Sequence, residues 1–168
     1  NNIQIIKNLS IGFKSQKGNQ ISILKNISTN IKKGETIGIV GESGSGKSTL
    51  ALAMMGYIKN GLFTIEGECL FESSNLLNMS SRDLEKIRGR KIAMIPQNAG
   101  QALTPNLKIG YQIEEALRLH TNLSKIERED KISELLNKVR LPAPKIMALR
   151  YPHELSGGQQ QRVAVAMA

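Results

Sequence analysis

Residues 41–48 read Gly41-Glu42-Ser43-Gly44-Ser45-Gly46-Lys47-Ser48. The stretch fits a glycine, four free positions and then Gly-Lys-Ser/Thr, a pattern whose backbone N–H groups surround phosphate oxygens. Its glycines allow a sharp turn and a close approach of the backbone to an anion. Lys47 then stands where an ammonium meets β- and γ-phosphates, and Ser48 stands where a hydroxyl ligates Mg²⁺. The stretch therefore predicts a site for a nucleoside triphosphate.

The sequence on either side of the loop supports this interpretation. Residues 35–40 predict a short buried strand, and residues 48–55 predict a helix with an apolar face. A helix start offers unpaired N–H groups and the positive end of the helix dipole. A dinucleotide fingerprint needs Gly-x-Gly-x-x-Gly, and residues 44–49 lack the third glycine. A glycine-rich turn that binds nothing is the remaining alternative, and the flanking strand and helix disfavour it.

A second motif, Leu155-Ser156-Gly157-Gly158-Gln159, lies near the end of the sequence. Ser156 is a suitable N-cap for a helix over the following residues to Ala168, so this is a second helix start with bare glycines. Together the two motifs resemble the nucleotide-binding domain of ABC transporters. The resemblance implies a head-to-tail dimer in which the signature motif of one subunit closes over the γ-phosphate held by its partner. The alternative is a plain helix cap.

Two further elements fit the resemblance. The strand-like run at residues 91–95 ends at Pro96-Gln97 and resembles the Q-loop strand of the family. The resemblance implies that Gln97 reaches Mg²⁺ and the attacking water and connects the site to a membrane subunit. Phe13 stands where the family has an aromatic residue that stacks on adenine, although ordinary core packing is the alternative role for Phe13.

The implied cofactors are ATP and Mg²⁺. Lys47 and Gln97 are the implied catalytic residues, and Ser48 and Gln97 are the implied magnesium contacts. The implied nucleotide contacts are Phe13, Gly41, Glu42, Ser43, Gly44, Ser45, Gly46, Lys47, Ser48, Thr49, Gln97, Ser156, Gly157, Gly158 and Gln159.

The resemblance covers essentially the whole chain and implies an α/β fold of the P-loop NTPase type. A parallel-sheet core is expected beside an N-terminal antiparallel β subdomain and a helical subdomain, incomplete at the C-terminus. The expected ranges are 1–34 and 61–74 for the antiparallel subdomain, 35–60 and 91–97 for the nucleotide-binding core, 98–154 for the helical subdomain, and 155–168 for the signature motif and its helix.

Three segments, at residues 84–97, 102–106 and 151–156, resemble the ATP-binding subunits of peptide and nickel importers. Asn98-Ala99 and Thr104 depart from the sequence that is usual in that branch. The implied partners are a second ATPase subunit, identical or different, transmembrane permease subunits and, indirectly, an extracellular solute-binding protein. The implied location is peripheral, at the cytoplasmic face of the cell membrane. Whether the solute is a peptide or a metal complex stays open.

Composition excludes several other classes. The formal charge is +9 and the pI about 9.8, but the basic residues are scattered and aromatic residues make up only 4%. This indicates solvated faces and no nucleic-acid partner. No apolar run reaches the roughly 18 residues of a membrane span. Cys69 is the single cysteine, which excludes an internal disulfide and suits a reducing cytosol.

The 168 residues contain no apolar strand that ends in Asp-Glu, the segment that family members carry after the signature helix. We therefore expect a truncated domain that is marginally stable and hydrolyses no ATP by itself. The alternatives are a soluble ABC ATPase of translation or DNA repair, and a non-hydrolysing fragment.

Overall fold

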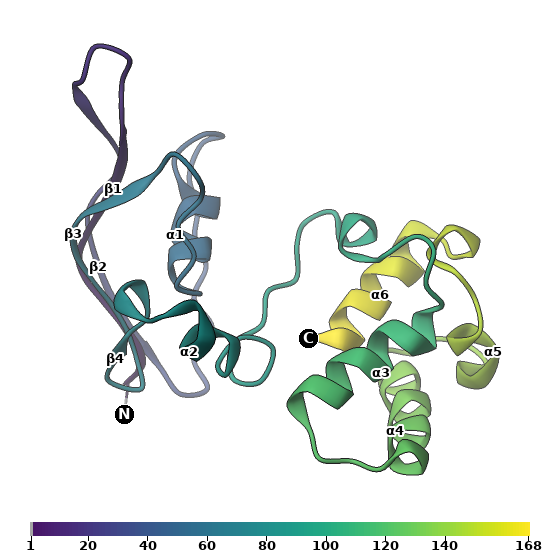
Figure 1. The fold of residues 1–168 in the computed structure, drawn as a ribbon. Coiled ribbons are helices and arrows are strands. Elements are labelled where there is room, and N and C mark those ends of the chain that lie inside the picture. The colour runs from purple at the N-terminus through teal and green to yellow at the C-terminus, as the bar shows by residue number, and fades with distance from the viewer. Residues whose placement is uncertain (1) are drawn as a thin grey trace. The chain divides into compact units, whose positions relative to one another are not determined.

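The computed structural model describes residues 2–168. It divides into two compact units, one ending at Arg88 and the other beginning at Gly89. Figure 1 shows strands and short helices in the first unit and helices in the second. Among the described residues, no helix is both long and apolar enough to cross a membrane.

One antiparallel sheet forms the frame of the first unit. Its strands are β1 (Asn2–Lys14), β2 (Gln20–Lys32), β3 (Phe63–Phe71) and the short β4 (Ser74–Asn75), in the order β2-β1-β3-β4. A turn at residues 17–19 joins β1 to β2, where the Ser15 N–H donates to the Asn19 carbonyl at 2.8 Å. The two strands therefore form a hairpin within the expected antiparallel range 1–34.

Helix α1 (Lys47–Ala53) is connected to this sheet by a buried glutamine. Gln4, on β1, donates from Nε2 to the Met54 carbonyl at 2.6 Å and to Cys69 Sγ at 3.4 Å. Cys69 is fully buried, and its burial raises the pKa of the thiol although the Gln4 hydrogen bond opposes the shift. The cysteine therefore serves as a small packed side chain.

Two short elements complete the first unit, η1 (Leu76–Asn78) and α2 (Ser81–Glu85). Ser80 is the N-cap of α2, because its hydroxyl accepts the Asp83 N–H at 3.2 Å. The Asp83 carboxylate accepts the Ser80 hydroxyl at 2.7 Å. The buried apolar side chains of this unit are Ile6, Leu9, Ile11, Leu24, Leu50, Ala53, Cys69, Phe71, Leu76 and Leu84.

Two strand expectations are wrong for the described residues. Residues 35–40 form no strand, and Ile39 and Val40 are 44% and 96% exposed. In the expected run at residues 91–95, Ile92 forms only an isolated bridge and residues 93–95 form no strand, and Met94 is 45% exposed. A parallel strand is stable only when neighbouring strands take its hydrogen bonds and helices cover its faces. Within residues 2–168 neither segment has such a neighbour.

The second unit consists of four α-helices around an apolar core. They are α3 (Ile109–His120), α4 (Lys125–Lys138), α5 (Pro144–Ala148) and α6 (Gly157–Met167), with 3-10 turns η2 (Ala99–Ala102) and η3 (Pro152–Glu154). The core contains Leu103, Ile109, Ile113, Ile132, Leu136, Leu141, Met147, Leu155 and Val163. Ile132 and Leu136 lie on the buried face of α4, and Ser124 caps α4 through a capping box with Glu127.

Candidate functional site

The loop at residues 41–48 leads directly into α1. Gly44 and Gly46 have φ values of +82° and +88°, in the left-handed region that side chains with a Cβ disfavour. Gly46 also lies against β2, because a Cβ there would stand 2.7 Å from Leu24 Cδ2. The loop therefore needs glycine at 46 for both its conformation and its contact with the sheet.

Lys47 curls back across its own loop. Its Nζ donates to the carbonyls of Gly41 and Glu42 at 2.8 and 2.6 Å, and Ser45 Oγ lies 3.4 Å away. The loop thus holds a positive charge at its centre. Phosphate oxygens are stronger acceptors for an ammonium than neutral carbonyls are, so the arrangement suits a bound phosphate chain.

The first turn of α1 supplies the other groups that suit an anion. The N–H groups of Lys47, Ser48 and Thr49 have no intrahelical acceptor, as in any first turn. The Ser48 side chain is exposed. A hydroxyl at this place fits a magnesium contact, although the described residues contain no group of three or more Asp, Glu, His or Cys side chains that could hold a metal.

Phe13 lies near the end of β1, where it pairs with Ile21 of β2 and is half-buried. The same strand β2 carries Ile23 and Leu24, which lie against Gly46. Strand β2 is thus the common neighbour of Phe13 and the loop.

The other expected site residues belong to the second unit. Gln97 lies in an exposed bend before η2. Ser156 caps α6: its Oγ accepts the Gln159 N–H at 3.3 Å, and Gln159 Oε1 accepts the Ser156 N–H at 2.9 Å. Leu155 is buried, and a Cβ on Gly157 or Gly158 would meet no atom within 4 Å. The start of α6 is therefore held in the core by Leu155, whereas Gly157 and Gly158 are exposed.

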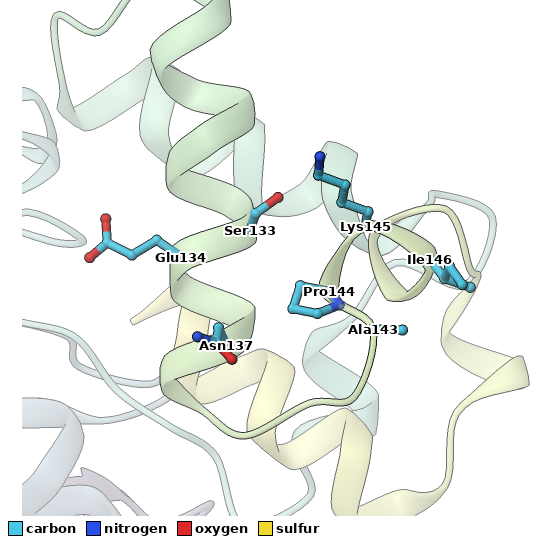
Figure 2. A pocket seen from close by; sticks show the side chains of 7 residues that line it. All are labelled: Ser133, Glu134, Asn137, Ala143, Pro144, Lys145 and Ile146. Atoms are coloured by element: carbon cyan, nitrogen blue, oxygen red, sulfur yellow. The ribbon is translucent and has the colours of Figure 1, made fainter.

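A surface hollow that the sequence did not predict lies between α4 and the start of α5. Its volume is about 620 Å³, and it is lined by Ser133, Glu134, Asn137, Ala143, Pro144, Lys145 and Ile146. Figure 2 shows Ser133 on the side of α4 that faces Pro144 and Lys145, whereas the Glu134 carboxylate extends to the other side of the helix. None of these residues belongs to the predicted nucleotide site.

Sequence reasoning also missed Gln160. Its amide donates to the carbonyls of Pro152 and Leu155 at 2.8 and 3.2 Å, in the turn that precedes α6. Its place one helical turn after the N-cap was the available signal, because such a side chain can reach back to the helix start.

Comparison with known proteins shows the family of this chain. Residues 24–168 match the ABC transporter family. The oligopeptide transport ATP-binding protein OppD of Bacillus subtilis (strain 168) is 39% identical over 97% of this chain. The dipeptide transport ATP-binding protein DppD of Lactococcus lactis subsp. cremoris (strain MG1363) is 38% identical, and the glutathione import ATP-binding protein GsiA of Salmonella paratyphi A is 41% identical, each over 97% of the chain.

Solved structures agree. The ATP-binding cassette MJ0796, described as a dimer in a post-hydrolysis state bound to ADP and Pi, has a TM-score of 0.84 and 34% identity over 98% of this chain and 68% of that chain. The expected mixed α/β fold of ATP-binding cassettes is thereby confirmed. The chain spans 46% of the B. subtilis OppD and 27% of the GsiA protein.

Proposed function

This chain belongs to the ABC transporter family of ATP-binding proteins, and from that premise we propose that it is part of the ATP-binding subunit of an importer for peptides. The observation that carries the proposal is the position of Lys47 inside a glycine loop that opens a helix. The relatives named for oligopeptide, dipeptide and glutathione transport support the class of substrate.

In the proposed mechanism, Lys47 and the N–H groups of residues 46–49 bind the β- and γ-phosphates of ATP, and Phe13 stacks on the adenine. Ser48 and Gln97 are the residues that would hold Mg²⁺, which would neutralise phosphate charge. Gln97 also orients the water that attacks the γ-phosphorus. Such a site accelerates the reaction through positioning and charge stabilisation rather than through a covalent intermediate.

The signature motif completes this site in trans. We propose that Ser156, Gly157, Gly158 and Gln159 approach the γ-phosphate held by the loop of a partner subunit. The exposed glycines at 157 and 158 support this role, because nothing on their own unit covers them. ATP then closes the pair of subunits, and hydrolysis opens it.

The proposed partners are a second ATPase subunit and transmembrane permease subunits at the cytoplasmic face of the membrane, with a solute-binding protein acting through the permease. A test is to purify the full gene product with an affinity tag and look for the permease. Reconstituted vesicles should then take up labelled oligopeptides only with ATP. Uptake of a nickel complex instead of peptides would correct the substrate class, and an ATPase that never associates with a permease would support a soluble function in translation or DNA repair.

A further inference from the structure

Gln160 connects two carbonyl groups in the turn that precedes the signature helix. Its Nε2 donates to the Pro152 carbonyl at 2.8 Å and to the Leu155 carbonyl at 3.2 Å. The Pro152 carbonyl also accepts the Leu155 N–H at 3.1 Å. The two amide hydrogens of Gln160 therefore hold the short segment 152–155, which directly precedes the N-cap residue Ser156.

The oxygen end of the same amide lies against η2. A Cβ built on Gly100 would stand 2.2 Å from Gln160 Oε1 and 3.4 Å from Gln160 Cδ, with no other described atom within 4 Å. No real Cβ comes as close as 2.2 Å, so a side chain at position 100 would force the Gln160 amide to move. Because Nε2 is fixed by two hydrogen bonds, the amide cannot turn away without losing them.

Gln160 thus contacts two segments, and each segment is close in the sequence to a proposed site residue. Gly100 lies three residues after Gln97, and Leu155 lies directly before Ser156. The hydrogen bonds that Ser156 makes are local, to Gln159 and Gln160 within its own helix. They define the cap, but they do not fix the cap relative to η2.

We propose that Gln160 is a positioning residue for ATP hydrolysis, which holds the signature turn at a fixed place relative to the segment that follows Gln97. This inference rests on the proposed function. Without the amide, the start of α6 keeps its own capping box but loses the two hydrogen bonds to the turn before it and the contact of Gln160 with Gly100. The N–H groups of Gly157 and Gly158 are then no longer held in the direction that closure requires.

A second glutamine of the same unit provides a matched control. Gln112 is buried, and its Nε2 donates to the carbonyls of Thr104 and Leu107 at 3.0 and 2.8 Å. Its Oε1 accepts the Thr104 N–H at 2.8 Å. Gln112 therefore makes the same kind of contact as Gln160, but with a loop that contains no proposed site residue.

The experiment compares Gln160→Ala, Gly100→Ala, their double variant and Gln112→Ala in the full gene product assembled with its partners. The measured quantities are the melting temperature, KM for ATP and kcat for hydrolysis. We expect Gln160→Ala and Gly100→Ala each to lower kcat by about tenfold with KM within about twofold, because the lost interaction acts in the closed state. Gln112→Ala should lower the melting temperature but leave kcat within about twofold.

The double variant tests the contact itself. Ala at 160 removes the only atoms that a Cβ at 100 would meet, so Gly100→Ala should cost nothing further in that background. Gln160→Met, which keeps the length of the side chain and a high helix propensity but has no donor, should repeat the loss of kcat if the alanine variant folds poorly.

The inference is overturned if the Gln160 variants keep kcat within about twofold of the wild type, if Gln112→Ala loses as much kcat as Gln160→Ala, or if the two single losses multiply in the double variant. In each of these cases the wild type still hydrolyses ATP, and the proposed function stands. A wild-type assembly that binds no ATP would instead contradict the proposed function.

Discussion

Ser124 and Ser156 begin two helices of the second unit with the same reciprocal hydrogen bonds. Ser124 Oγ accepts the Glu127 N–H at 3.4 Å and the Ser124 N–H donates to Glu127 Oε2 at 2.7 Å. Ser156 and Gln159 repeat this arrangement at 3.3 and 2.9 Å. The two caps have equal local roles, but only Ser156 is followed by two open glycines.

This pair allows the trans role of the signature motif to be tested. Ser156→Arg should leave ATP binding by the separate subunit unchanged but lower the kcat of the assembled transporter by about a hundredfold, because a large side chain blocks closure over the partner's γ-phosphate. Nucleotide titration and steady-state hydrolysis measure the two effects.

Ser124→Arg is the matched control, since it removes an equivalent cap at an estimated cost of about 0.5–2 kcal/mol. It should lower stability as much as Ser156→Arg does and leave kcat nearly unchanged. Normal hydrolysis by Ser156→Arg would show that this helix start does not act on a partner's nucleotide.

Lys47→Ala should weaken ATP binding. The variant loses a charge-assisted contact worth about 1.5–3 kcal/mol, which corresponds to a rise in Kd of about 10- to 150-fold. Isothermal titration with ATP and Mg²⁺ measures the change. Lys59→Ala, which removes an exposed lysine of the same unit outside the loop, should leave Kd unchanged. Equal ATP affinities of Lys47→Ala and the wild type would show that the loop is not part of the ATP-binding site.

Ala143→Gly should raise the free energy of unfolding. Ala143 has φ +45° and ψ +65°, a left-handed conformation that costs a residue with a Cβ about 1–2 kcal/mol. Glycine loses about 0.5–1 kcal/mol through the greater freedom of the unfolded chain, so a net gain of about 0.5–1 kcal/mol is expected.

The matched control for that change is Ala148→Gly, in the right-handed turn of α5. There glycine relieves no strain and should lower stability by about 0.5–1 kcal/mol. Urea unfolding followed by circular dichroism measures both variants. Opposite signs support the strain at 143, and two losses of similar size would contradict it.

Glu134 should make stability depend on pH in acid. Hydrogen bonds from Lys138 and Lys131, at 2.6 and 2.9 Å, lower the pKa of Glu134 from 4.5 to about 2. Since the folded-state pKa is the lower one, this stabilisation is present above about pH 4.5 and is lost as the pH falls toward about 2. Glu134→Gln cannot titrate and should lose less stability over that interval than the wild type.

Urea midpoints at about pH 6 and pH 3 measure this difference. It should shrink in about 1 M salt, because the group is exposed and the Debye length is then only about 3 Å. Glu129→Gln, on the same helix and without an ion pair among the described residues, is the control. Parallel acid profiles for the wild type and Glu134→Gln would contradict the assignment.

Local patterns predicted much of the structure. The cap at Ser156, the helix that follows the glycine loop and the helical character of residues 98–154 all follow from interactions within a few residues of each other. Such interactions depend on side-chain type and spacing, and both can be read directly from the chain. The glycine loop and its lysine were identifiable for the same reason.

Contacts between distant segments could not be read in this way. Residues 35–40 and 91–95 have strand-like sequences, but a strand also needs neighbouring strands, and within the described residues neither segment belongs to a sheet. The approach of Gln160 to Gly100 joins residues 60 positions apart, and only the packing of α6 against η2 brings them together. By itself the sequence determined the local conformations and the chemistry of the loop. Tertiary structure alone decided which amide holds which carbonyl, because a hydrogen bond across the chain exists only where packing brings donor and acceptor within about 3 Å.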